Sequence, residues 1–264
     1  MATAITRIYT PEGFVVASDG RVCNSSSGKV IKDDMQKVFL FGNAPIAFSF
    51  TGAAHLGRAD RDDTNEVLFD FIAAFSSSVQ AISARRYGAL DEYIAKVAKR
   101  IHRALEDRIH RGNIELPDVH FDEPSENGCT IVDVYVDGYH EERPSKVAIR
   151  FFHEDQRLFE PEVRIEPLEP ARFMFHGIGE IGRKVVSHDP SLAGYIEPVY
   201  YHDCPTLETA ISLSRAFIEA CAGPEGAEID PDASSSIGGR THIAVVSPAR
   251  GFEWVPGFEP AQPR

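Results

Sequence analysis

A threonine, an aspartate and a lysine near the start of the chain have types and spacing that nucleophilic chemistry could use. Thr3 begins a strand-like run, Asp19 follows the apolar run that returns from a Pro-Glu-Gly turn, and Lys37 immediately precedes "VFLFG". A threonine hydroxyl is a poor nucleophile until a base removes its proton, and an N-terminal threonine can use its own α-amino group as that base. A nearby lysine ammonium would lower the pKa of the hydroxyl and favour the attacking form. These three residues are therefore candidates for a nucleophile and the groups that tune it.

Each of these residues also has an ordinary structural explanation. Threonine is favoured at the start of a strand, Asp-Gly is a common turn pair, and a lysine at a strand edge can simply be solvated. Lys29 and Lys32 are nearby alternatives to Lys37, although Lys37 alone adjoins the apolar strand. Spacing alone therefore leaves both explanations open.

The elements that must position these residues are strand pairs and helix pairs. Apolar runs predict strands, and apolar residues at helical spacing predict helices. The expected strands cover 3–10, 13–18, 37–42, 45–52, 129–136, 145–152, 171–179, 241–247 and 251–257, and the expected helices cover 65–82, 90–111, 181–188 and 206–223. Several of these strands are apolar on both faces, which is typical of a sheet that is covered on both sides.

The order of these elements is strands, two helices, strands, two helices, strands. Two sheets stacked face to face, with a helix pair outside each, would accommodate that order as an α+β protein with a four-layer αββα sandwich. The Gly/Asp/Ser-rich segment 223–239 is expected to be a loop, and the tail 258–264 is expected to be loose. No linker divides the 264 residues, so a single domain is predicted over 1–264.

Composition excludes several classes of function. The formal net charge is −13, which argues against non-specific binding to nucleic acid or to an anionic membrane. The four cysteines are widely spaced without a C-x-x-C motif, and there is neither a secretory signal nor an apolar run of membrane-spanning length. These features predict a cytoplasmic protein with reduced thiols.

Three segments together resemble a known family. "TAITRIYTPEGFVVASDGR", "KVFLFGNAPIAFSFTGAA" and "SSSIGGRTHIAVV" are similar, in this order, to landmark regions of proteasome β-subunits and their bacterial homologues, which are N-terminal-nucleophile hydrolases. The likeness covers nearly the whole chain. It implies the αββα fold and threonine-type hydrolysis of a peptide or amide bond, with no metal or organic cofactor.

The resemblance also implies roles for individual residues. Thr3 would be the nucleophile with its α-amine as base, Asp19 would orient Lys37, the amide of Gly52 would bind the oxyanion, and Ser236 would support the amino terminus. The chain departs from the family pattern in two places. Ile178 stands where a serine is expected, and Ile237 separates Ser236 from the two glycines. Met1 and Ala2 precede Thr3, so a free amine at Thr3 requires cleavage after Ala2.

The family also implies partners. A peptide or protein would be the substrate, and the chain would assemble into a homo-oligomeric ring or open spiral; the ring size and a partner ATPase stay open. The expected helix 90–111 carries a basic set of side chains that an acidic neighbouring surface such as 118–128 could complement. This set comprises Lys96, Lys99, Arg100, Arg103, Arg108 and Arg111. A non-catalytic assembly subunit is the alternative function.

The sequence gives weaker indications for two other types of site. Gly177-Ile-Gly-Glu-Ile-Gly182 fits the dinucleotide-binding pattern G-x-G-x-x-G, and Glu197 lies at the distance of the usual acidic partner. The expected helix after it is short, however, and no parallel βαβ series surrounds it. The ten histidines show no metal-ligand spacing, so no metal site is expected.

Overall fold

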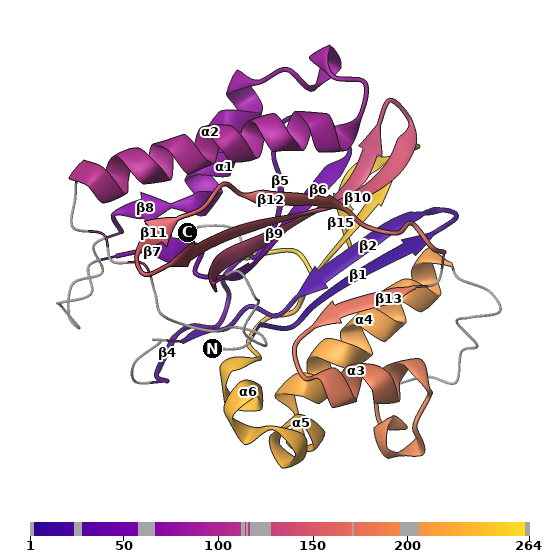
Figure 1. Cartoon of the computed structure of the whole chain (residues 1–264). Coiled ribbons are helices and arrows are strands. Elements are labelled where there is room, and N and C mark those ends of the chain that lie inside the picture. Colours follow the sequence, from indigo (N-terminus) through magenta and orange to yellow (C-terminus); the bar gives the residue numbers. More distant parts are fainter. Residues whose placement is uncertain are drawn as a thin grey trace.

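The computed structural model describes residues 3–23, 28–57, 67–111, 114, 116, 128–170, 172–195 and 206–261. Within these ranges the chain is a mixed α+β protein, and its described strands pair antiparallel. Figure 1 shows the sheets in the middle of the molecule, with helices α1 and α2 on one side and helices α3 and α4 on the other.

The first sheet carries the start of the chain. Its strands follow the order β13-β1-β2-β14-β15. They are β1 (Ile5–Thr10), β2 (Gly13–Ser18), β13 (Phe173–His176), β14 (His242–Ser247) and β15 (Gly251–Trp254). β1 and β2 form the predicted hairpin, and β14 pairs with the far side of β2. The start of β1 therefore lies beside the end of β2, which brings Thr3 close to Asp19.

The second sheet has the main order β11-β10-β9-β6-β5, and β12 also pairs with β10. Its strands are β5 (Val38–Leu40), β6 (Ile46–Gly52), β9 (Cys129–His140), β10 (Arg143–Glu154), β11 (Arg157–Leu158) and β12 (Glu162–Ile165). Two small hairpins lie outside both sheets, β3 (Val22–Cys23) with β4 (Val30–Lys32), and β7 (His55–Leu56) with β8 (Phe69–Asp70). The long hairpin β9–β10 is the central part of this sheet.

The helices follow the predicted order with two corrections. They are α1 (Phe71–Ala81), α2 (Leu90–Arg111), α3 (Gly179–Val186), α4 (Leu207–Ala222), α5 (Pro224–Ile229) and α6 (Pro231–Ser236), and the 3₁₀ turns are η1 (Ala84–Arg86) and η2 (Pro190–Leu192). The helix predicted over 65–82 begins only at Phe71, because β8 precedes it and the Asp70 carboxylate caps it by accepting from the Ala73 amide at 3.0 Å. Residues 65 and 66 lie outside the described ranges.

The second correction concerns 223–239, where a loop was expected and two short helices are found. Pro224 and Pro231 each occupy the first helical position, where a missing amide hydrogen has no cost. The Asp230 carboxylate accepts from the Ala233 amide at 2.9 Å and caps α6. Proline and aspartate, which suggest a loop in a sequence, act here as helix-start signals.

The hydrophobic core explains why β2 is apolar on both faces. Val15 and Ala17 pack in a cluster with residues of α3 and α4, whereas Phe14 and Val16 pack in another with residues of the second sheet. A third cluster joins β6, β9 and β10 to α1 and α2. Alternate side chains of a strand point to opposite faces, so β2 contacts helices on one side and a sheet on the other.

The interface between the two sheets also contains buried charges. Arg7 of β1 is fully buried and pairs with Asp137 of β9 through two contacts of 2.7 and 2.9 Å. A terminal guanidinium nitrogen of Arg7 also lies 2.6 Å from Glu166, and its guanidinium lies 4.3 Å from the centre of the Tyr135 ring. Although burial opposes it, the two carboxylates raise the pKa of Arg7. This network ties the first sheet to the second near the middle of β1.

Part of the tail 258–264, which was expected to be loose, contacts the first sheet and the cluster around α4. The carbonyl of Phe258 accepts from the Ile243 amide at 3.2 Å, and its ring packs on the cluster around α4. The remaining part of the expected loose tail is described to residue 261. Among the described helices, none combines the length and apolarity needed to cross a membrane.

Candidate active site

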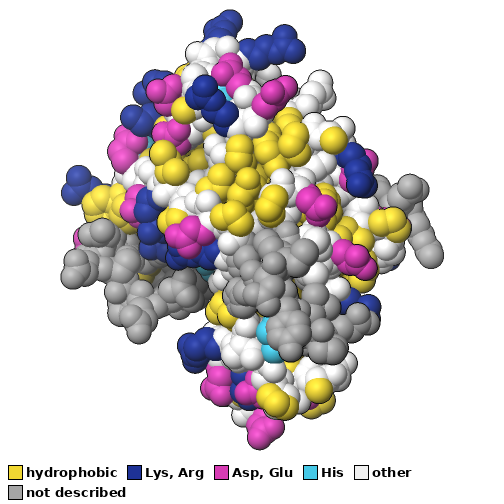
Figure 2. Space-filling view, turned by 90° about the vertical axis from the view of Figure 1, so that its right-hand side faces the viewer, with side chains coloured by type: hydrophobic (Ala, Val, Ile, Leu, Met, Phe, Trp, Pro, Cys, Tyr) yellow, Lys and Arg dark blue, Asp and Glu magenta, His cyan; other side chains and the backbone are white. Residues whose placement is uncertain are grey.

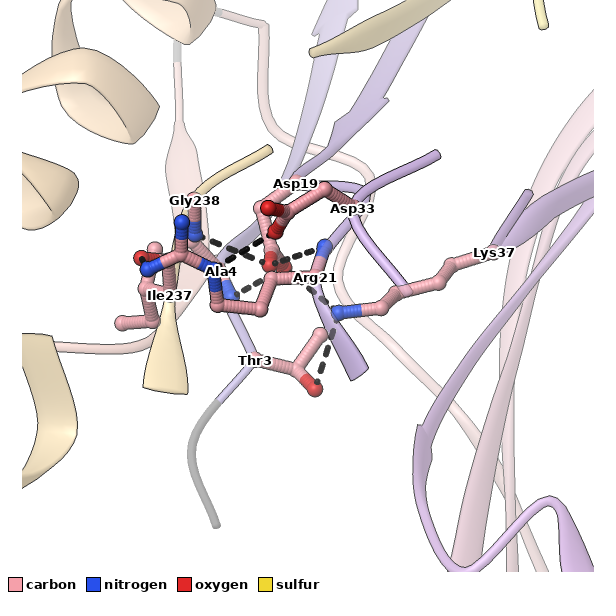
Figure 3. A network of polar contacts seen from close by, with 8 residues as sticks. All are labelled: Thr3, Ala4, Asp19, Arg21, Asp33, Lys37, Ile237 and Gly238. Atoms are coloured by element: carbon pink, nitrogen blue, oxygen red, sulfur yellow. Dashed lines mark hydrogen bonds and ion pairs between the residues drawn. The ribbon is translucent and has the colours of Figure 1, made fainter. Parts of the chain in front are cut away.

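Asp19 is the centre of a polar network at the end of the neighbouring strands β1 and β2 of the first sheet (Figure 3). Its side chain is fully buried. Oδ1 accepts from the Ala4 amide at 3.0 Å and from the Lys37 ammonium at 2.8 Å, and Oδ2 accepts from the amides of Arg21 at 3.1 Å and Gly238 at 3.2 Å. Four donors compensate the cost of burying the carboxylate and fix its orientation.

Lys37 joins Asp19 to Thr3. It lies immediately before β5, and its side chain extends across to the first sheet (Figure 3). Its Nζ lies 2.8 Å from Asp19 Oδ1 and 3.4 Å from Thr3 Oγ1. Lys37 is only 8% exposed, so its charge acts on the Thr3 hydroxyl with little screening by solvent. The arrangement can lower the proton affinity of the hydroxyl, which is the chemistry expected from the sequence.

The structure also distinguishes Lys37 from the two other lysines that precede it in the sequence. Lys32 is exposed and lies 3.7 Å from Asp34, and Lys29 is exposed as well. Neither side chain is in the network of Thr3 and Asp19 drawn in Figure 3. The position next to the apolar strand therefore distinguishes Lys37 from the other lysines.

The segment "SSSIGG" contributes to the site through its backbone. Arg21 donates to the carbonyls of Ser235 at 3.2 Å and Ile237 at 3.4 Å, and the Gly238 amide donates to Asp19. Gly239 has a φ of +70°, and a Cβ there would lie 2.2 Å from the carbonyl oxygen of Asp33. Only glycine fits such a close approach, so the glycine pair allows this segment to dock against Asp19 and its neighbours.

Ser236 does not join the network. Within the described chain, its hydroxyl donates to the Asp232 carbonyl at 3.3 Å, one turn back in α6, and not to Thr3, Asp19 or Lys37. Ile178, which the resemblance aligns with another serine, is 4% exposed and packs in the cluster with α4. Among the described residues, neither side chain is therefore hydrogen-bonded to Thr3, and the supporting role of Ser236 stays a prediction.

Gly52 ends β6 at the same end of the second sheet as Lys37. The Phe50 amide donates to the Lys37 carbonyl at 3.2 Å, and Gly52 follows two residues later. Gly52 has a φ of +88°, and a Cβ there would lie 2.7 Å from the Ile131 carbonyl oxygen. The backbone therefore requires glycine at this position whether or not its amide also binds an oxyanion.

The described structure does not provide a dinucleotide site of the usual kind. β13 precedes the G-x-G-x-x-G segment and α3 follows it, but β13 pairs antiparallel with β1. A Cβ on Gly182 would lie 2.3 Å from the Phe175 ring, so this glycine serves close packing of helix on strand. Glu197 lies outside the described residues. The described residues likewise contain no group of three or more His, Cys, Asp or Glu that could hold a metal ion.

Comparisons with known proteins add no assignment. No protein-family model matches the chain, and no curated protein matches its sequence. The candidate function therefore depends on the site itself and on the resemblance of the three segments.

Proposed function

We propose that this chain is a threonine-type peptidase or amidohydrolase of the proteasome β-subunit type, with Thr3 as an N-terminal nucleophile. The observation that carries the proposal is the position of the Lys37 ammonium, 2.8 Å from the buried Asp19 carboxylate and 3.4 Å from the Thr3 hydroxyl. A solvated lysine at a strand edge would not be 8% exposed with its charge shared between these two groups.

The way in which the helices pack on the two sheets supports the same proposal. Helices α1 and α2 pack on the second sheet, helices α3 and α4 pack on the first, and a separate cluster lies between the sheets. We propose that these contacts form the four-layer αββα sandwich of N-terminal-nucleophile hydrolases. In that arrangement Thr3 lies at the start of β1, where both sheets contribute residues to the site.

The reaction would proceed in two steps. The Thr3 hydroxyl oxygen attacks the carbonyl carbon of the substrate, and its proton passes to the α-amine of Thr3. The amide C–N bond then breaks, the leaving amine takes that proton, and an ester to Thr3 remains. Water attacks the ester and returns a proton to the threonine oxygen through the same amine. Lys37, held by Asp19, stabilises the developing negative charge on the hydroxyl oxygen throughout.

This mechanism needs a free α-amine on Thr3, which cleavage of the bond between Ala2 and Thr3 must create. We expect the active population of the protein to begin at Thr3, because an α-amine with a pKa of about 7.7–8.0 is suited to act as a base near neutral pH. N-terminal sequencing of protein fractions that hydrolyse a peptide library would check this. A fraction that hydrolyses peptides and begins only at Ala2 would exclude the free-amine mechanism.

A non-catalytic assembly subunit is the second candidate, and Ile178 is the observation that favours it. A buried isoleucine occupies the position where the resemblance implies a supporting serine. In either case we propose assembly into a homo-oligomeric ring or spiral.

The six basic side chains of α2 named above are all exposed. Figure 2 shows hydrophobic side chains gathered on the upper part of one face of the molecule, as is common at protein–protein interfaces. The acidic segment suggested as their complement lies almost entirely outside the described residues.

A further inference from the structure

A row of paired residues crosses the first sheet at Ile5, two positions after Thr3. His176 pairs with Ile5, Ile5 pairs with Ser18, and Ser18 pairs with His242. Directly paired residues of antiparallel strands share a face. Ser18 follows Phe14 and Val16 at alternate positions, and these two pack against the second sheet. The side chains of Ser18 and His242 are therefore on the face that is turned toward the second sheet.

A matching row on the second sheet lies opposite. Val38 pairs with Ser49, and Ser49 pairs with Tyr135. The Tyr135 ring stacks on His176 with the ring centres 4.5 Å apart, which joins the two rows at one end. At the other end β14 packs against β5 and β6. Ser49 has the same parity as Ala47, which packs between the sheets, so its hydroxyl belongs to the same interior.

Several polar atoms of this interior lack a hydrogen-bond partner within the part of the chain that the structure describes. Ser18 Oγ, Ser49 Oγ and both ring nitrogens of His242 are buried without a hydrogen-bond partner among the described residues. All three residues are 0% exposed. A neutral imidazole carries one donor and one acceptor, and buried polar groups are normally satisfied by protein or by ordered water. Four such atoms on two facing rows are the kind of lining that holds buried water.

His242 is next to charges that keep it neutral. Burial lowers its pKa to about 4, the charges of Arg240 and Lys37 lower it too, and Asp34 opposes them. A histidine in these surroundings does not take up the proton of Thr3. It can still offer an acceptor nitrogen to a water molecule and donate from the other nitrogen.

One N–H group of the Lys37 ammonium is not used by the contacts described above. Its ammonium has three N–H groups, and its acceptors in the described chain are Asp19 Oδ1 and Thr3 Oγ1. The third N–H therefore has no acceptor there, although the side chain is buried. With only two acceptors, the Lys37 ammonium can still change its position relative to Thr3. A third acceptor would fix the ammonium in place.

We propose that His242, Ser18 and Ser49 bind water between the two sheets, and that His242 is a positioning residue that holds Lys37 against Thr3 through this water. The water site is defined by the unpartnered atoms alone. Its effect on catalysis rests on the proposed hydrolytic function.

Crystal structures of three proteins test the water site without any assay. The three are the wild type, His242→Phe and the control His102→Phe, which removes another buried histidine with an unpartnered ring nitrogen, in α2. We expect density for water within hydrogen-bond distance of His242 and of Ser18 or Ser49 in the wild type and in the control. In His242→Phe we expect that water to be lost and the Lys37 ammonium to move away from Thr3. A wild-type interior without water at these atoms, or an unmoved Lys37 in His242→Phe, would overturn the proposal whether or not the protein hydrolyses peptides.

Steady-state kinetics test the positioning role. We expect His242→Phe to lower kcat about ten-fold, the effect of one lost hydrogen bond to a charged group, and to leave KM nearly unchanged because His242 is fully buried and therefore cannot contact a substrate directly. His242→Gln keeps a donor and an acceptor and should retain most of kcat, and His102→Phe should match the wild type. Equal losses in His242→Phe and His102→Phe would mean that any buried histidine has this effect and would overturn the role. A wild type without hydrolysis would instead count against the proposed function, and the crystal structures would still decide the water site.

Discussion

Lys37→Ala is expected to reduce peptide hydrolysis by about 100-fold or more while the chain still folds, since removing a preorganised charge from the reacting oxygen commonly has an effect of this size. The variant removes the ammonium that lies 3.4 Å from the Thr3 hydroxyl. It leaves Asp19 with three backbone amide donors, from Ala4, Arg21 and Gly238, so the carboxylate stays compensated. The measurement is kcat/KM on one peptide substrate, with far-UV circular dichroism to establish folding.

Three variants complete this experiment. Lys32→Ala removes an exposed lysine that lies 3.7 Å from Asp34 and should keep full activity. Thr3→Ala and Asp19→Asn should be as inactive as Lys37→Ala, because they remove the nucleophile and the group that holds the lysine. Wild-type activity in Lys37→Ala would transfer the role to Lys32 or Lys29, or end the proposed mechanism.

Arg7→Met is expected to lower the free energy of unfolding by about 3–5 kcal/mol, the usual cost of removing one partner of a buried ion pair. Arg7 is fully buried, and so is Asp137, to which it donates at 2.7 and 2.9 Å. Without the guanidinium, Asp137 would keep a carboxylate between two sheets without its main partner. Urea unfolding followed by fluorescence measures the change.

Two controls separate burial of the pair from the presence of an ion pair as such. The double variant Arg7→Met/Asp137→Leu should recover part of the loss, because it removes the fully buried carboxylate as well and leaves only Glu166 without its guanidinium partner. Arg215→Met breaks the exposed pair of Arg215 and Glu219 in α4, also 2.7 Å long, and should cost less than about 1 kcal/mol. A cost for Arg7→Met as small as that for Arg215→Met would contradict the account of this interface.

The order of strands and helices could be predicted because apolar patterning is local. Continuous apolar runs such as that of β2 indicated a strand with both faces covered, and the structure has helices on one face and a sheet on the other. The burial of Arg7 could not be predicted, because its partner Asp137 is 130 positions away in the sequence and only the stacking of the sheets brings them together. The helices α5 and α6 were missed because proline and aspartate serve both loops and helix starts.

The candidate site was predicted in part. Residue type, spacing and the resemblance indicate Thr3, Asp19 and Lys37, and the structure brings all three together. The amides of Ala4 and Gly238 carry no side-chain signal in the sequence. His242 was missed because a single histidine in the apolar run "THIAVV" looks like an ordinary core residue, and its unpartnered nitrogens are visible only in three dimensions.

The most direct test of the central claim is to identify the residue that a peptide electrophile modifies. The purified protein is incubated with a peptide that carries a carbonyl electrophile, digested, and mapped by mass spectrometry. The account predicts one adduct, on Thr3 of chains that begin at Thr3, and none in Lys37→Ala over the same time. An adduct on another residue, or hydrolysis of peptides by a protein in which Thr3 stays unmodified, would contradict the claim that Thr3 is the nucleophile.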